Sequence, residues 1–125
     1  MKFKFFLLLF LLLLNTSMNA EDLEKVRAKQ FVTQLSAYME KHSENLALIT
    51  KYSEKKDRTP GEDRLYFWTL CNTVTNLERS EKLIKDNPEF SQYLNGNVIT
   101  SLEENLDFHK HVTSLLVGTE NECKS

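Results

Sequence analysis

Two histidines are the side chains whose positions favour a specific chemistry. His42 and His109 each fall in the middle of an apolar helical face, where an imidazole is either a hydrogen-bonded core group or a group that titrates near neutral pH. If their helices run parallel in a bundle, the two rings lie at one level and can meet, and protonation of such a pair would destabilise the fold. A metal site is the weaker alternative, because two histidines without nearby cysteine or aspartate ligands make a poor zinc set. We expect no metal ion and no other cofactor.

Cys71 and Cys123 are the only two cysteines of the chain. In an oxidising compartment two lone thiols usually pair, and closing so long a loop stabilises a chain by about 4 kcal/mol. We therefore expect an intramolecular disulfide that brings the C-terminal tail back onto the helix that holds Cys71. The alternative is a buried free Cys71 and an exposed Cys123 that pairs with a second molecule.

Catalysis finds little support in the sequence. There is no glycine-rich phosphate loop and no Gly-x-Ser-x-Gly nucleophile elbow. Adjacent acids such as Glu103 and Glu104 are typical of a helix surface. Lysine and arginine are interspersed with aspartate and glutamate and the net charge is −2, whereas binding to a phosphate backbone requires clustered basic residues. We expect a non-catalytic protein that does not bind nucleic acid.

Residues 1–20 have the order of a secretory signal peptide. A basic start at Lys2 and Lys4 is followed by an apolar run and then by a polar stretch that ends at Ala20. The apolar run is about half as long as the roughly twenty residues that a membrane-spanning helix needs. We therefore expect cleavage after Ala20 and secretion of a chain without a membrane anchor, in preference to an uncleaved anchor.

Residues 21–125 have the length of one domain, and their apolar positions recur with the period of α-helices. The pattern predicts long helices over about 22–55, 60–86 and 98–117, and a short helix over 88–94. Three amphipathic helices joined by short turns predict an all-α, up-down-up three-helix bundle.

Local signals mark several helix ends. Thr59 and Glu62 have the spacing of a reciprocal capping box at the start of the second long helix. Pro88 must end that helix and can begin the short one. The Asn-Gly pair ending at Gly96 predicts the end of the short helix, and Gly118 predicts the C-terminal cap of the last helix.

Each long helix has one apolar face, and we expect these faces to form the core. The predicted core residues of the first helix are Ala28, Phe31, Val32, Leu35, Tyr38, Met39, His42, Leu46 and Ile49. Those of the second are Tyr66, Phe67, Leu70, Cys71, Val74, Leu77 and Ile84. Those of the last are Ile99, Leu102, Leu106, His109, Val112 and Leu116.

Trp68 does not share the apolar face of its helix, because it lies about 100° round from Phe67. The first interpretation is that the C-terminal tail packs over the indole, since Cys71 would bring the tail to this region. The second is that the indole stays partly exposed and, together with Leu65, anchors a partner or an apolar ligand.

The sequence favours a secreted protein that binds an extracellular macromolecular partner, with Leu65 and Trp68 as candidate contacts. The alternative is a carrier of a small apolar ligand, such as a fatty acid, inside the bundle. A third hypothesis is a bulk structural protein without a single partner. No motif chooses among the three or indicates the oligomeric state. The residues expected to line a ligand cavity are Phe31, Met39, Tyr66 and Phe67.

Overall fold

The computed structural model describes residues 19–124, so the predicted signal peptide lies, apart from its last residues, outside the described part of the chain. Within that part all regular structure is α-helical, and three of the four helices are long. No helix in this range combines the length and the apolar character needed to cross a membrane. The helices are α2 (Ala20–Ser53), α3 (Pro60–Asp86), α4 (Pro88–Ser91) and α5 (Gly96–Ser114).

The described residues divide into two compact units, one over 19–30 and one over 31–124. In the first unit, the Asn19 side chain accepts a hydrogen bond of 2.9 Å from the backbone N–H of Asp22 at the start of α2. The second unit contains the rest of α2 together with α3, α4 and α5, and it holds every candidate site residue. The single domain over residues 21–125 stays a prediction.

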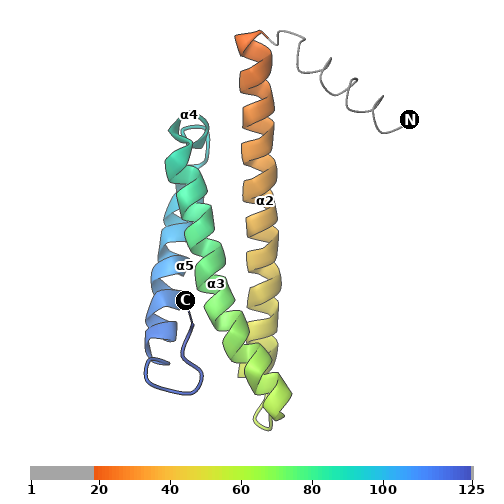
Figure 1. Ribbon diagram of the computed structural model, residues 1–125, viewed down its shortest axis with the longest axis vertical. Helices are drawn as coiled ribbons and strands as arrows, with labels where there is room; N and C mark the ends of the chain where they lie inside the picture. The colour runs from red at the N-terminus through yellow and green to blue at the C-terminus, as the bar shows by residue number, and fades with distance from the viewer. Residues whose placement is uncertain (1–18, 125) are drawn as a thin grey trace, which may run out of the picture. The chain divides into compact units, whose positions relative to one another are not determined.

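Within the second unit the long helices alternate in direction. Figure 1 shows α3 running back antiparallel to α2, and α5 returning beside α3 after the short α4. The backbones of α3 and α5 approach each other closely, and α4 packs against the end of α3. The predicted all-α, up-down-up bundle with a short additional helix is therefore confirmed.

The turn from α2 into α3 is built by a reciprocal capping box, as predicted. The backbone N–H of Thr59 donates to Glu62 Oε2 at 2.9 Å, and the backbone N–H of Glu62 donates to Thr59 Oγ1 at 3.3 Å. Lys55 also donates to both carboxylate oxygens of Glu62 at 2.7 Å. These hydrogen bonds, that from Lys55 above all, lower the pKa of Glu62 to about 2, so the cap is charged at neutral pH.

Arg58 ties the end of α2 to the start of α3. Its guanidinium donates to the carbonyl oxygen of Tyr52 at 2.8 Å and to Asp63 Oδ1 at 2.6 Å. The same group lies 4.6 Å from the centre of the Tyr66 ring, which is a cation–π distance. Since one planar cation contacts both helices, the hairpin has a defined entry angle.

Three predicted helix boundaries in the second half of the chain differ from those in the structure. The short helix ends at Ser91, and hydrogen-bonded turns continue to Leu94. The Asn-Gly pair begins α5 instead of ending the short helix, because the Asn95 side chain accepts from the backbone N–H of Asn97 and caps the new helix. The last helix ends at Ser114, and turns lead from there to Gly118, whose φ of 78° suits a residue without a Cβ.

The core is formed mainly by predicted apolar positions. An exception is Val32, which is 58% exposed although the periodicity placed it inside, because it lies at the margin of the apolar stripe of α2. Phe31 packs against Phe90 of α4 with the ring centres 5.8 Å apart. The buried apolar side chains are Phe31, Leu35, Tyr52, Leu70, Leu77, Ile84, Phe90, Leu102 and Leu106.

A row of polar residues on α3 is also buried, which the sequence reasoning missed. They are spaced by four, three and four residues and therefore lie on one side of the helix. The hydroxyls are satisfied by carbonyl oxygens one turn earlier, as Thr73 Oγ1 is by Thr69 at 2.8 Å. Asn76 donates to the carbonyl oxygen of Tyr38 at 2.8 Å, which sets this side against α2. The row comprises Thr69, Thr73, Asn76 and Ser80.

Candidate functional site

The predicted disulfide joins Cys71 of α3 to Cys123 of the tail, with the two Cα atoms 5.5 Å apart. The tail reaches α3 because the chain turns at Gly118, whose N–H donates to Glu122 Oε2 at 2.9 Å. A covalent bond therefore holds the segment after α5 against the middle of α3. A disulfide is typical of proteins that fold in an oxidising compartment.

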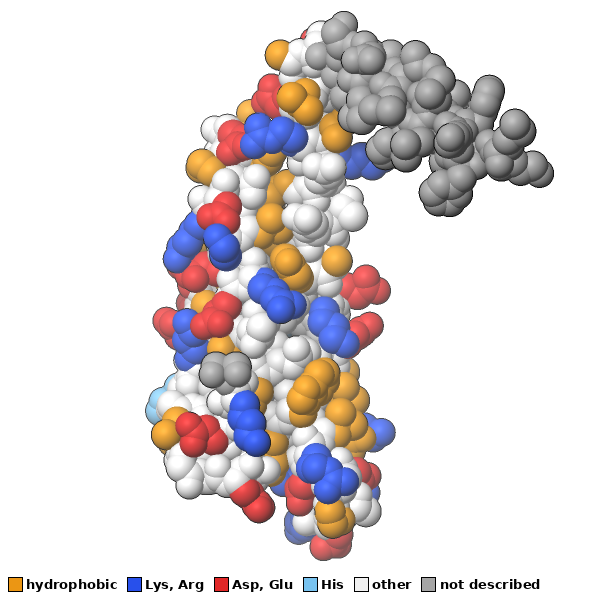
Figure 2. Space-filling view, in the orientation of Figure 1, with side chains coloured by type: hydrophobic (Ala, Val, Ile, Leu, Met, Phe, Trp, Pro, Cys, Tyr) orange, Lys and Arg blue, Asp and Glu red, His pale blue; other side chains and the backbone are white. Residues whose placement is uncertain are grey.

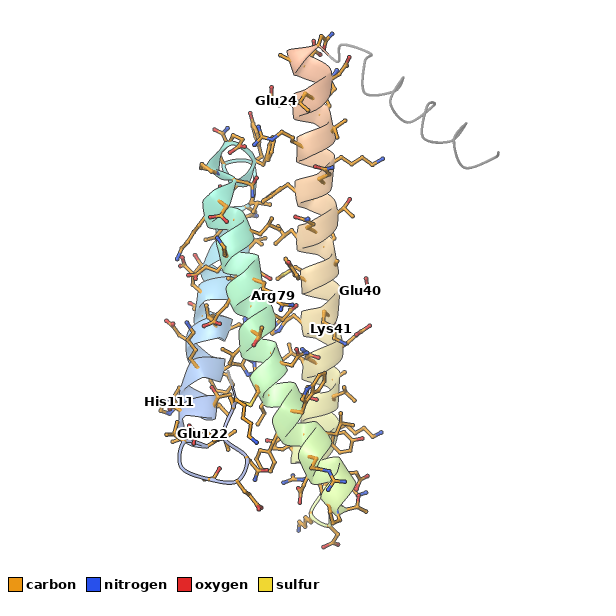
Figure 3. All side chains as sticks on the ribbon, in the orientation of Figure 1. Glu24, Glu40, Lys41, Arg79, His111 and Glu122 are labelled. Carbon is orange, nitrogen blue, oxygen red and sulfur yellow. A yellow bond between two sulfur atoms is a disulfide. The ribbon has the colours of Figure 1, made fainter. Side chains whose placement is uncertain are left out.

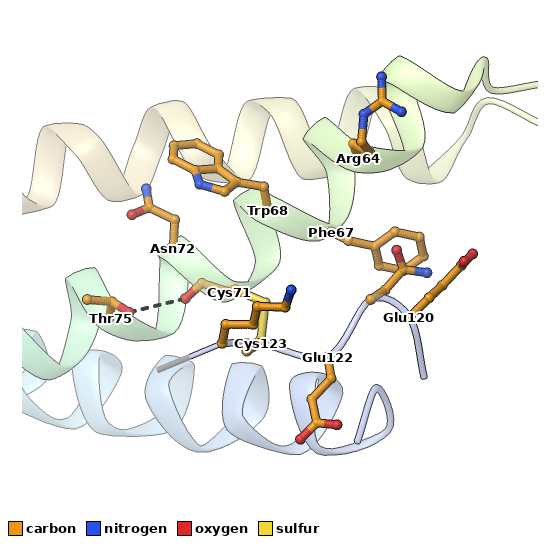
Figure 4. A pocket seen from close by; sticks show the side chains of 11 residues that line it. Arg64, Phe67, Trp68, Cys71, Asn72, Thr75, Glu120, Glu122 and Cys123 are labelled. Atoms are coloured by element: carbon orange, nitrogen blue, oxygen red, sulfur yellow. Dashed lines mark hydrogen bonds between the residues drawn. A yellow bond between two sulfur atoms is a disulfide. The ribbon is translucent and has the colours of Figure 1, made fainter. Parts of the chain in front are cut away.

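The tail and α3 border a surface hollow of about 520 Å³. Figure 4 shows the Trp68 indole projecting from α3 on one flank and the tail with Cys123 on the other. The hollow thus joins residues that are far apart in the sequence. Its lining residues are Arg64, Phe67, Trp68, Cys71, Asn72, Thr75, Glu120, Asn121, Glu122, Cys123 and Lys124.

Trp68 remains 58% exposed beside the tail, so the interpretation in which the tail buries the indole is wrong. The reason is geometric, because the disulfide holds the tail at Cys71, which lies about 60° round the helix from Trp68. Leu65, one turn before Trp68, is also exposed. The two residues predicted as contacts therefore share an accessible side of α3.

This accessible side is mixed in charge. Figure 2 shows hydrophobic side chains gathered over the lower half of α3 and the adjacent part of α2, with charged side chains of both signs around them. The hollow itself is lined by two basic residues, Arg64 and Lys124, and by two acidic residues, Glu120 and Glu122. An aromatic centre within a polar rim is the usual composition of a protein-binding surface.

His42 of α2 and His109 of α5 meet, as the parallel arrangement of the two helices predicts. The ring centres lie 6.1 Å apart with the ring planes nearly perpendicular. His109 is only 3% exposed, and the exposed Phe108 ring lies edge-on to it at 5.2 Å. In both histidines the Nδ1 atom is buried without a hydrogen-bond partner.

Burial lowers the pKa of both histidines. For His42 a hydrogen bond to the Asn105 side chain acts in the opposite direction but does not cancel the effect of burial. For His109 burial is the larger cause, and the neighbouring His42 lowers the pKa further because two imidazolium ions would repel each other. Both rings are therefore neutral at pH 7.

Asn45 lies one turn after His42 and was not singled out by the sequence reasoning. It is 0% exposed, and neither its amide oxygen nor its amide nitrogen has a hydrogen-bond partner. Unpaired buried amides are costly and rare. The only signal in the sequence is its position, three residues after a histidine on the apolar face of α2.

A second surface cleft of about 290 Å³ lies between α2, α3 and α5. Of the residues expected to line one ligand cavity, Met39 borders this cleft and Phe67 borders the hollow at the tail. Met39 and Phe67 therefore border two different hollows. The cleft is lined by Met39, His42, Leu77, Asn97, Val98, Ser101, Leu102 and Asn105.

Within residues 19–124, no group of three or more histidine, cysteine, aspartate or glutamate side chains is placed to hold a metal ion. Glu78 pairs with Lys110 at 3.0 Å and Glu81 pairs with Lys85 at 2.8 Å, so both carboxylates have lysine partners. A scan against protein-family models, a search of curated proteins and a search of solved structures found no match to this chain.

Proposed function

We propose that the protein is secreted and acts, without catalysing a reaction, by binding an extracellular macromolecular partner through the side of α3 that carries Leu65 and Trp68. The observation that carries this proposal is the exposure of Trp68 beside a hollow braced by a disulfide. Tryptophan is among the residues that contribute most to protein interfaces, because its large ring buries much area with little loss of conformational entropy.

The rigidity of the surroundings supports this proposal. Trp68 lies on a long helix whose start is capped at Thr59, and Cys71, one turn later, is bonded to the tail. A side chain on a braced helix loses less freedom on binding than one on a loop. Secretion is supported by the order of residues 1–20 and by the disulfide, which is typical of proteins that fold in an oxidising compartment.

The test is a binding experiment with the secreted chain. Proteins captured from extracellular fluid are identified, and the affinity of each purified candidate is measured for the wild type and for Trp68→Ala. The variant should bind at least about 30-fold more weakly, since a central tryptophan contributes about 2 kcal/mol or more. Trp68 is the only tryptophan, so its fluorescence should shift to shorter wavelength as the partner covers it.

Tyr93→Ala provides the matched control. Tyr93 is another strongly exposed aromatic residue, but it follows α4 and does not line the hollow. Its replacement should change the affinity by less than about threefold. Equal losses for the two variants, or a partner whose affinity is unaffected by Trp68→Ala, would contradict the proposed surface.

A second candidate function, the carriage of a small apolar ligand, is favoured by the cleft at Met39. Its volume of about 290 Å³ is at the lower limit of small-molecule sites, which begin near 300 Å³. Leu77, Val98 and Leu102 supply apolar walls, and Asn105 supplies a polar group. Organic extraction of the protein as produced, followed by mass spectrometry, should release a stoichiometric lipid, and its absence would leave only the partner-binding function.

A further inference from the structure

We propose that His42 and His109 form a pH-sensitive latch that holds the Phe31–Ser53 part of α2 against α3 and α5 at neutral pH and releases it on acidification. The inference is independent of the proposed partner. It concerns two imidazoles contributed by different helices, with ring centres 6.1 Å apart.

The position of the pair makes protonation unfavourable in the closed bundle. His109 is almost completely buried, and the Nδ1 atom of each ring has no acceptor that would stabilise an added proton. Protonation of both rings would also place two positive charges next to each other, one of them on the almost completely buried His109. Opening at this interface exposes the rings to solvent, where both can be charged.

The charged groups around the pair do not offset this cost. On the side of α3 that meets α5, Glu78 pairs with Lys110 and Glu81 pairs with Lys85. On α2, the neighbouring Lys41 pairs with Glu44, and both are largely exposed. On α5, the ionisable residues within two positions of His109 are Asp107, Lys110 and His111, and all three are exposed to solvent. The carboxylates on α2 and α3 thus already neutralise lysines.

The structure indicates which part would move. The disulfide at Cys71 and the ion pair between Lys110 and Glu78 connect α3 to α5 and its tail. At the level of the histidines, by contrast, α2 has no covalent link or ion pair of this kind among residues 19–124. It is attached by packing, by the hydrogen bond between His42 and the Asn105 side chain, and by the hydrogen bond from Asn76 to the carbonyl oxygen of Tyr38. The unpaired amide of Asn45 weakens the same interface. Acidification should therefore release α2 and leave the α3–α5 pair together.

The direction of the pH effect follows from the linkage between proton binding and opening. The closed state has histidine pKa values below the ordinary 6.5, and the open state has ordinary values. The stabilisation of the closed state is therefore complete above about pH 6.5 and is lost as the pH falls from there towards the closed-state values. Between about pH 7.5 and pH 5 the opening constant should rise by up to about 30-fold for each histidine that stays neutral when closed.

The test is hydrogen exchange of the disulfide-bonded chain, followed by mass spectrometry, at about pH 7.5 and pH 5 after correction for the intrinsic rate. Peptides from residues 31–53 should lose protection at low pH, while those from α3 and α5 keep theirs. In His42→Gln/His109→Gln this pH dependence should disappear. NMR titration of the wild-type imidazoles provides a readout that does not depend on folding of a variant, and both groups should titrate below pH 6.5.

His111→Gln is the matched control, because His111 lies on the outer side of α5, as Figure 3 shows, and is exposed. It should keep the full pH response. The latch is excluded if residues 31–53 stay protected at about pH 5, if all helices lose protection together, or if the double variant responds to pH as the wild type does.

Discussion

The effect of removing the disulfide on the free energy of unfolding can be calculated directly from the length of the loop that it closes. The double variant Cys71→Ser/Cys123→Ser keeps both side chains small and eliminates the covalent link between α3 and the tail. The bridge spans 52 residues of sequence, so its loss frees a long loop in the unfolded chain. On the chain-entropy model the free energy of unfolding should fall by about 4 kcal/mol.

This is a large share of the total stability. A domain of about this size is stable by roughly 5–15 kcal/mol, so the variant should still fold but with a melting temperature lower by about 15–30 °C. The unfolded variant should also be more expanded than the cross-linked chain. The slope of unfolding free energy against urea concentration should therefore increase, because more surface becomes exposed on unfolding.

The measurement is urea unfolding followed by far-ultraviolet circular dichroism, with oxidised wild type as the reference. A Cys71→Ser chain truncated after Gly118 is the control, since it lacks both the link and the contacts of the tail. If the bridge acts mainly on the unfolded chain, the two variants should agree within about 0.5 kcal/mol. A loss below about 1 kcal/mol in the double variant, with an unchanged slope, would refute the entropic account.

Three further predictions concern single residues. Thr59→Ala should lower the free energy of unfolding by about 1 kcal/mol in urea titrations, because α3 loses its N-cap. Asn45→Leu should raise it by about 1 kcal/mol or more, because an unpaired buried amide is replaced by an apolar side chain of similar shape; a loss would mean that Asn45 is in fact hydrogen-bonded. Lys55→Met should raise the pKa of Glu62 from about 2 towards 4.5, as measured by NMR titration. Because the folded-state pKa is depressed, the wild-type capping charge persists as the pH falls to about 2, whereas the variant should lose it at a higher pH.

The helix beginnings illustrate what sequence reasoning can reach. Thr59 and Glu62 are three residues apart, and their capping box depends only on backbone geometry within one turn. Asn95 shows the limit of the same reasoning. An Asn-Gly pair can end one helix or begin the next, and here the capping hydrogen bond to Asn97 decides for the second.

Only part of the candidate site could be predicted from the sequence. The number of cysteines favoured the pairing of Cys71 with Cys123, and the similar depth of His42 and His109 in parallel helices allowed a contact between them without deciding it. The structure shows both. The unpaired amide of Asn45 did not follow, because hydrogen-bond partners come from other helices. Whether the tail covers Trp68 depends on where the tail meets α3. The periodicity of α3 carries no information about that position.

The sequence by itself determined the class of fold, the order of the helices and most of their apolar faces, because these depend on interactions between residues three or four positions apart. Only the tertiary structure decided which faces are covered. Thr69, Thr73 and Ser80 are buried because α3 is packed between two neighbours and its small polar side chains can satisfy their hydroxyls on their own backbone. Burial is a property of the neighbouring helices, so it is decided only when the helices pack.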